Sequence, residues 1–362
     1  MEEIKKKKSN KGLVAIIIIL LIALLGAIGY ICYDKGVFDN LLNKEKPVPT
    51  EEPKQEETID KDRISFVFSS VSYNDGDHDV LDLYGMKQDG SIVKLTSDLD
   101  IAYRAFDISD NTLYYVGKDD TIHSIILDNN FEDKKMNVKI NKNYWNINVD
   151  GESIIIDGLN GDNHWFQEKY SFNNEKEKLS FISSGTDYFF QGKFYYTDRK
   201  TDSLNCYDFE NSKTNVIAKE ANIEIADGKY IIYSSNEKMY LYDIAKMQSS
   251  LIKNATSSAA VSLNLFAISD DIVYFINNNK IYKYENNNVS ELLKLESDKD
   301  YHYDLLRINK DKFFISRQTY SQNGSGEYTL KFYVYDVKNN TIEETKQDYK
   351  ALVYRSDMIY NK

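Results

Sequence analysis

Apolar residues follow two different patterns along the chain. Residues 13–33 read LVAIIIILLIALLGAIGYICY, a run of 21 positions without a charge. From residue 63 onward the apolar runs are only four to seven residues long, rich in Tyr, Ile, Phe and Val, and bounded by polar clusters. At about 1.5 Å per residue, the first run is long enough to cross a hydrocarbon core of about 30 Å as one helix. The second pattern lacks a helical period and predicts an all-β domain.

A short apolar strand recurs through the all-β region at an interval near forty residues. Its copies are ISFVF (64–68), TLYYV (112–116), SIIID (153–157), KFYYT (193–197), KYIIY (229–233), IVYFI (272–276) and KFFIS (312–316). From the second copy on, successive copies start 36 to 43 residues apart. This spacing is typical of a β-propeller, in which each blade is a four-stranded sheet.

Each unit ends on a strand that we assign to the innermost position of a blade. These strands fall at 102–109, 145–151, 186–191, 221–228, 265–271, 305–311 and 352–357. They predict about seven blades, within a range of six to eight. Because the chain opens on a second strand and closes on an inner one, residues 351–357 are expected to complete the blade that begins at Ile64. Such closure removes free sheet edges, and the absence of proline from residues 63–362 fits continuous strand ladders.

One repeat resembles a known family in its residues. The segment LDLYGMKQDGSIVKLT (81–96) resembles the strand, Asp-Gly turn and strand of TolB-like propeller repeats. The ISDNTLYYV and ADGKYIIYSS units are similar to YWTD-related bacterial surface propellers of unknown function, although the YWTD tetrad itself is absent. The resemblance implies a propeller with a binding or scaffolding role, and it carries over no catalytic residue.

Charge and proline usage divide the N-terminal region. Lysines precede the apolar run, so the positive-inside rule places residues 1–12 in the cytoplasm and the C-terminal part outside. Residues 34–62 hold all three prolines and several glutamates, the composition of a stiff, solvated extracellular linker. The sequence therefore predicts a single-pass cell-membrane protein with a basic tail, a transmembrane helix at 13–33, this linker, and a propeller domain at 63–362. A cleaved signal peptide is the alternative.

Composition indicates that the chain folds, which partner class it excludes, and in which environment the outer domain lies. With 42% apolar and 13% aromatic residues, the chain is not disordered throughout. A formal charge of −12 argues against a nucleic-acid partner, which needs a basic face. Cys206 is the only cysteine outside the apolar run, so the outer domain has no internal disulfide. An outer domain without a disulfide is more typical of a bacterial surface protein than of a eukaryotic ectodomain.

Motifs that carry catalysis are absent from the sequence. There is no nucleophile elbow, P-loop, dinucleotide-binding fingerprint, zincin motif or paired C-x-x-C. We therefore expect no catalytic residue and no cofactor. The alternating Asp75, Asp77 and Asp79 resemble the start of a calcium loop, but the later Gly and Glu of that loop are missing. The favoured interpretation of these residues is a solvated hairpin turn, with calcium as the alternative.

Three connections between second and third strands are longer than the others, at 70–79, 158–165 and 319–328. In a propeller these connections share one face with the crossings that lead into the inner strands. Aromatic and charged side chains gather there, as they do in glycan-binding and peptide-binding sites. The candidate ligand-binding residues are Tyr103, Arg104, Tyr144, Trp145, Trp165, Asp187, Tyr188, His302 and Tyr303. The alternative is that these tyrosines simply pack between blades.

The sequence thus favours a membrane-anchored, extracytoplasmic binding or scaffolding module over an enzyme. The expected partner is an envelope protein or a cell-surface glycan. The alternative is a polysaccharide hydrolase or lyase with carboxylates in the propeller funnel. A purely structural envelope subunit is a third interpretation, and it predicts an apolar patch on the sides of the blades.

Overall fold

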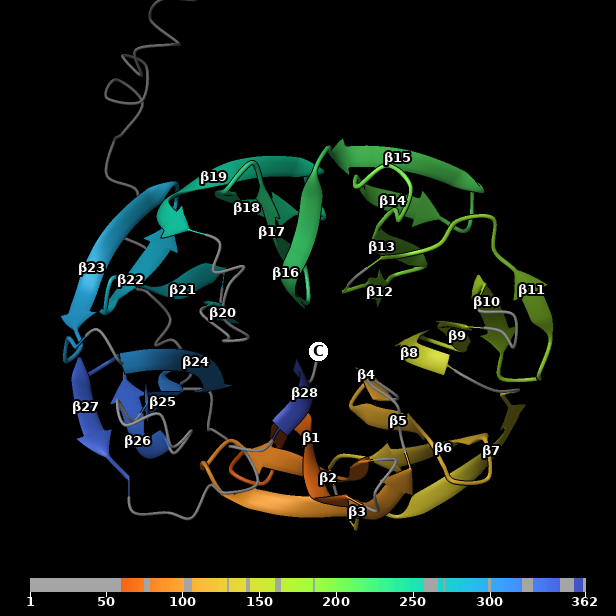
Figure 1. Ribbon diagram of the computed structural model, residues 1–362, viewed down its shortest axis with the longest axis horizontal. Helices are drawn as coiled ribbons and strands as arrows, with labels where there is room; N and C mark the ends of the chain where they lie inside the picture. The colour runs from red at the N-terminus through yellow and green to blue at the C-terminus, as the bar shows by residue number, and fades with distance from the viewer. Residues whose placement is uncertain are drawn as a thin grey trace, which may run out of the picture. The chain divides into compact units, whose positions relative to one another are not determined.

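The protein is a seven-bladed β-propeller. The computed structural model describes residues 60–74, 79–100, 106–128, 130–140, 144–159, 164–184, 186–256, 266–269, 271–298, 301–320, 328–345 and 355–360. Within them, 28 strands form seven antiparallel four-stranded sheets arranged as a ring (Figure 1). The predicted fold is therefore confirmed. No helix in this part of the chain is long and apolar enough to cross a membrane, and the predicted transmembrane segment lies outside it.

In each blade the strands follow one another from the centre of the ring outward. The innermost strands are β28 (Arg355–Tyr360), β4 (Phe106–Ser109), β8 (Tyr144–Asp150), β12 (Tyr188–Phe190), β16 (Ala221–Asp227), β20 (Phe266–Ser269) and β24 (Tyr301–Asn309). The second strands are β1 (Ile64–Asn74), β5 (Thr112–Val116), β9 (Ser153–Leu159), β13 (Lys193–Thr197), β17 (Tyr230–Ser235), β21 (Ile272–Asn277) and β25 (Lys312–Tyr320).

The outer half of each blade is built in the same order. The third strands are β2 (Asp79–Lys87), β6 (Thr121–Ile126), β10 (Trp165–Ser171), β14 (Leu204–Asp208), β18 (Lys238–Asp243), β22 (Lys280–Glu285) and β26 (Tyr328–Asp336). The outermost strands are β3 (Ile92–Asp100), β7 (Asp133–Lys139), β11 (Lys176–Lys178), β15 (Lys213–Ala218), β19 (Gln248–Thr256), β23 (Asn288–Lys294) and β27 (Thr341–Glu344).

The last strand of the chain closes the ring. β28 pairs with β1 in antiparallel register, with Phe66 opposite Tyr360 and Phe68 opposite Met358. One blade therefore takes its innermost strand from the C-terminal end and its other three from the start of the domain. This is the closure that the leftover inner strand predicted, and it leaves no open edge at the centre of the ring.

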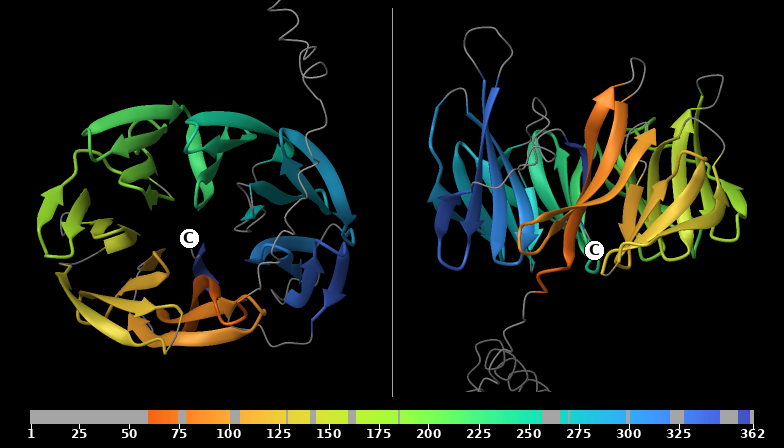
Figure 2. Two further views of the ribbon diagram at one scale, coloured as in Figure 1. Left: turned by 180° about the vertical axis from the view of Figure 1, so that it is seen from behind. Right: turned by 90° about the horizontal axis from the view of Figure 1, so that it is seen from below.

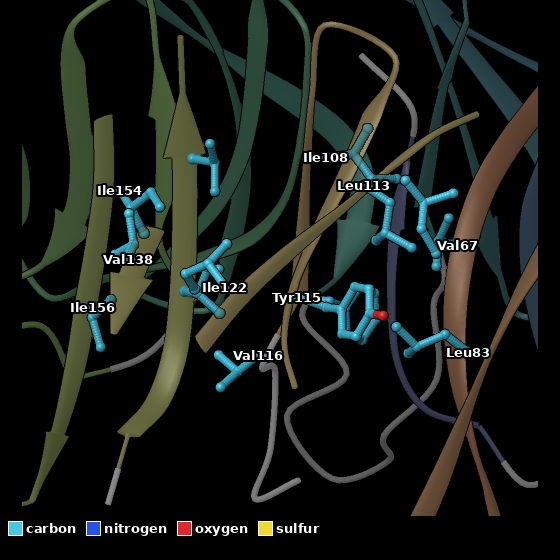
Figure 3. Close-up of a cluster of buried hydrophobic side chains, with 14 of the residues drawn as sticks. Val67, Leu83, Ile108, Leu113, Tyr115, Val116, Ile122, Val138, Ile154 and Ile156 are labelled. Carbon is cyan, nitrogen blue, oxygen red and sulfur yellow. The ribbon is translucent and has the colours of Figure 1, made fainter. Parts of the chain in front are cut away.

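The second strands read as continuous apolar runs because they are buried on both faces. In β9, Ile154 and Ile156 pack toward one neighbouring blade (Figure 3), whereas Ile155 packs toward the other. In β1, Val67 and Phe68 divide in the same way between two clusters. Since side chains alternate along a strand, a strand placed between two sheets needs apolar residues at every position.

The Asn-rich connections between strands are tight two-residue turns. Asn278 and Asn279 join β21 to β22, and both have positive φ, at 48° and 55°. Asn286 and Asn287 join β22 to β23 in the same conformation, at 49° and 62°. Two-residue hairpins of type I′ need positive φ at both central residues, and Asn tolerates this better than most residues do.

The ring has two different faces. We call the turn face the one that carries the first-to-second-strand turns, such as those at Gly151 and Gly228, together with the third-to-fourth-strand turns. We call the hairpin face the one that carries the second-to-third-strand connections. In Figure 2 (right), β1, β25 and β26 extend toward the hairpin face, and β1 starts at the turn face.

Candidate functional site

The long connections of the hairpin face are in part continuations of strands. β1 continues to Asn74 and pairs with β2 from Asp79 on, while β25 continues to Tyr320 and pairs with β26 from Tyr328 on. The sequence pattern predicted loops there because polar residues replace the apolar run. The backbone keeps pairing, since strand ladders need no apolar side chains. The tips of these hairpins, at 75–78, 160–163 and 321–327, lie outside the described residues.

A tryptophan and an arginine from adjacent blades stack on the hairpin face. The guanidinium carbon of Arg199 lies 3.9 Å from the ring centroid of Trp165, and the Trp165 side chain is half-buried. Asp198 fixes the turn that carries the arginine, because its carboxylate accepts the N–H of Lys200 at 2.9 Å and of Thr201 at 3.0 Å. The pair therefore presents an aromatic surface and a cation side by side at a blade boundary.

A second arginine lies among tyrosines near the start of β24. The guanidinium carbon of Arg317 lies 4.3 Å from the ring centroid of Tyr301 and 5.8 Å from that of Tyr333. Arg317 is only 6% exposed, and it also forms an ion pair with Glu296. The Tyr303 hydroxyl donates to the Glu296 carbonyl at 2.9 Å, and burial raises the pKa of Tyr303 to about 12. Arg317 and Tyr303 are thus part of the packing, whereas the adjacent His302 is half-buried.

The two candidates at the start of the fourth blade, Asp187 and Tyr188, are buried. Tyr188 is 4% exposed, and its hydroxyl donates to the Gly228 carbonyl at 2.8 Å on the turn face. Burial, and then the nearby carboxylates of Asp227, Asp107 and Asp150, raise the pKa of Tyr188 well above its usual value. Its neighbour Asp187 is 9% exposed and accepts a hydrogen bond from Ser183. The structure therefore separates the Tyr188 hydroxyl from the Trp165 stack of the hairpin face. Asp187 lies closer to that stack, because its partner Ser183 bridges to Asp198 beside Arg199.

The remaining predicted residues divide between buried and undescribed positions. Tyr144 is 9% exposed and belongs to the core between blades. Tyr103 and Arg104 lie outside the described residues, as does the side chain of Trp145. The calcium hypothesis concerns Asp75 and Asp77, which also lie outside them, and Asp79, which begins β2. Within the described part of the chain, no three His, Cys, Asp or Glu side chains converge as metal ligands would.

Polar contacts between blades gather at the turn face, and the sequence interpretation did not anticipate them. Asp107 accepts the N–H of Val149 at 2.6 Å, and Asp150 accepts the N–H of Gly192 at 2.5 Å. Each contact links an inner strand to the next blade, about one repeat further along the chain. In the sequence, these contacts correspond only to an Asp that recurs near the end of an inner strand. Asp is too common in turns for this recurrence to identify a hydrogen-bond partner in the next blade.

An arginine links three blades at the same face. Arg307 of β24 lies 2.7 Å from the carboxylate of Asp227 on β16 and donates to the Ile268 carbonyl of β20 at 2.8 Å. The hydroxyl of Ser65 donates to the Ile308 carbonyl and so ties in the first blade. A polar pocket of about 290 Å³ lies beside these groups. Asp227, Arg307 and Ser65 line this pocket, and their contacts join neighbouring blades.

Comparison with known proteins establishes the fold and no more. No protein-family model matches the sequence, and no curated protein matches it. Among solved structures, a puromycin hydrolase S511A mutant complexed with PGG is 8% identical, with a TM-score of 0.53. The match covers 79% of this chain and 53% of that one, so the chain spans about half the length of that enzyme.

Two further propeller matches are weaker. A chain of the nidogen/laminin complex is 11% identical, with a TM-score of 0.38, over 61% of this chain and 89% of that one. One of two prolyl endopeptidases is 11% identical, with a TM-score of 0.49, over 78% of this chain and 50% of that one. The chain is a seven-bladed β-propeller, and its similarity to these solved structures is distant.

Proposed function

We propose that the protein is a membrane-anchored extracytoplasmic binding module that holds an envelope protein or a cell-surface glycan on its hairpin face. The observation that carries this proposal is the half-buried Trp165 ring stacked with the Arg199 guanidinium. Partly exposed aromatic faces beside polar and cationic groups are the usual contact chemistry for both partner classes.

The chain enters the propeller at the turn face. β1 is the second strand of its blade and starts at the turn face, so the linker predicted at 34–62 joins the ring there. A stiff linker of this composition extends by roughly 3 Å per residue, which keeps the propeller clear of the membrane.

The hydrolase or lyase alternative requires two carboxylates, or a histidine, facing one funnel. Asp107 and Asp150 instead accept backbone N–H groups of neighbouring blades, and Asp227 pairs with Arg307. Carboxylates in these positions hold strands together. These contacts favour binding over catalysis as the role of the described inner strands.

The test is photo-crosslinking of the full chain in its native membrane. A photoreactive aromatic residue is placed at position 165 in one variant and at the exposed position of Ile126 on β6 in a matched control. The expected result is a discrete protein or glycan adduct that forms at position 165 and not at 126. Identical adducts at both positions, or none at 165, contradict the proposal. Mass analysis of the adduct separates a protein partner from a glycan.

A further inference from the structure

A cleft of about 830 Å³ opens between the blades β12–β15 and β16–β19, toward the turn face. Its floor is made by Tyr195, Cys206 and Tyr242, which are 1%, 6% and 6% exposed. Its rim includes Lys193 and Lys213. The volume lies in the range of ordinary ligand sites, and the mixture of aromatic floor and polar rim is typical of them. Nothing in the proposed role of the hairpin face uses this cleft.

The outer wall of the cleft is a sheet edge that lacks the usual protection. β15 is the last strand of its blade, and Lys213 is its only charged residue. By contrast, β7 carries four charged residues among seven, and all three residues of β11 are charged. Charged side chains on an edge strand discourage pairing with another chain. The uncharged stretch Thr214–Ala218 therefore leaves the outer edge of β15 open to a further strand.

Exposed apolar side chains gather around the same two blades. Among the described residues, the large apolar side chains classed as exposed are Ile126, Val216, Met247 and Leu251. Val216 on β15 is 62% exposed, Met247 is 65% exposed, and both line the cleft. Val216 and Met247 thus give the cleft an exposed apolar rim on the sides of the blades.

The rim carries a net positive charge in an otherwise acidic chain. Lys193, Asp208 and Lys213 lie in one row across the sheet, since each is paired with the next. The Asp208 carboxylate accepts hydrogen bonds from the Asn211 side chain at 3.1 Å and from the Glu210 N–H at 3.0 Å. Neither lysine forms an ion pair with any other described residue. In a chain of formal charge −12, this row attracts an anionic group.

We propose that the cleft and the edge of β15 bind an extended acidic peptide segment. The peptide adds as a strand to the outer edge of β15, where main-chain hydrogen bonds supply sequence-independent affinity. One apolar side chain enters the cleft between Val216 and Met247, and a neighbouring carboxylate faces Lys193 and Lys213. A small anionic molecule fits the cleft alone, but it leaves the open edge and the exposed apolar side chains unexplained.

The experiment uses a random heptapeptide library displayed on phage and selected against the full chain in detergent micelles. The expected result is enrichment of sequences with Asp or Glu within two residues of an apolar residue. A synthetic copy of the enriched peptide is expected to lose at least about tenfold in affinity on Val216→Asp and on Lys213→Glu. Both side chains are exposed, so these variants are expected to fold.

Two controls distinguish this site from other surfaces. Ile126→Asp makes the same apolar-to-acid change on a distant blade and is expected to leave binding unchanged. Trp165→Ala tests the hairpin face, and unchanged peptide binding there separates this inference from the proposed function. Slower hydrogen exchange of β15 amides, with β7 unaffected, is the signature of strand addition. The inference is overturned if no sequence is enriched, or if the enriched peptide binds the Val216→Asp variant as tightly as the wild type.

Discussion

The two faces of the ring use polar and aromatic side chains in opposite ways. At the turn face, Asp107 and Tyr188 are each 4% exposed and bond to backbone groups of the next blade. At the hairpin face, Trp165 is half-buried and stacks with the Arg199 cation.

The difference separates stability from recognition. A buried polar group is tolerated only when it is hydrogen-bonded, so each turn-face contact constrains the position of one blade against the next. A half-buried aromatic side chain beside a guanidinium contributes little to closure of the propeller, and its exposed part remains available to a partner. We therefore expect substitutions of Asp107 or Tyr188 at the turn face to change the free energy of unfolding, and substitution of Trp165 at the hairpin face to change binding.

The largest expected effect is on stability, from Asp107→Ala. The change leaves the Val149 and Ile108 amides without their acceptor in a buried site. It is expected to lower the free energy of unfolding by about 2–4 kcal/mol, measured by urea denaturation. Asp107→Asn is the matched control, because it keeps one acceptor oxygen and is expected to lose less. A stability equal to that of the wild type contradicts a structural role for the turn-face contacts.

The next effect is on binding, from Trp165→Ala. We expect about a tenfold weaker affinity for the cross-linked partner, which corresponds to about 1.4 kcal/mol. The free energy of unfolding is expected to change by less than about 1 kcal/mol, because the ring is only half-buried. Calorimetric titration and urea denaturation on one preparation measure both quantities. A large loss of stability with unchanged affinity contradicts the prediction, because Trp165 would then serve stability and not recognition.

Sequence sufficed for the fold because the second strands are buried on both sides. The apolar runs LYYV and III inside TLYYV and SIIID are typical of the strand that marks each blade. The inner strand expected near the C-terminus predicted the closure by β28. The site was only partly accessible from sequence. Trp165 falls within a long connection and was selected for that reason, but its partner Arg199 belongs to the next blade.

The contacts of Tyr188 show the same limit. A sequence pattern assigns a residue to a strand, but not the direction in which its hydroxyl extends along the channel. Tyr188 starts an inner strand at the hairpin side, yet it donates to Gly228 on the turn face. Contacts between repeats depend on how blades are rotated against one another, and a repeat spacing carries no information on that rotation.

The turn face also predicts a pH dependence. Burial raises the pKa of Tyr188 above its usual value, so the unfolded chain releases this phenolic proton near pH 10 while the folded chain keeps it. The folded state then binds more protons above about pH 10, and the free energy of unfolding falls as pH rises through this range. We expect Tyr188→Phe to reduce that fall by about 1 kcal/mol per pH unit, measured by urea denaturation at pH 9 to 11. An identical slope in both proteins contradicts the prediction.

The smallest expected effect is on partner binding at the hairpin face, from substitution of Arg199. Arg199→Gln removes the cation above Trp165, and exposed cation–π contacts are worth about 0.5–1 kcal/mol. Partner affinity is therefore expected to fall only two- to fivefold if Arg199 acts by holding the ring, and iodide quenching of tryptophan fluorescence is expected to rise. Arg199→Lys keeps the charge but loses the planar stack, so it is expected to behave like the Gln variant. The opposite result is full affinity in Arg199→Lys and a loss in Arg199→Gln as large as that of Trp165→Ala. In that case the positive charge contacts the partner, and the Trp165 ring only positions it.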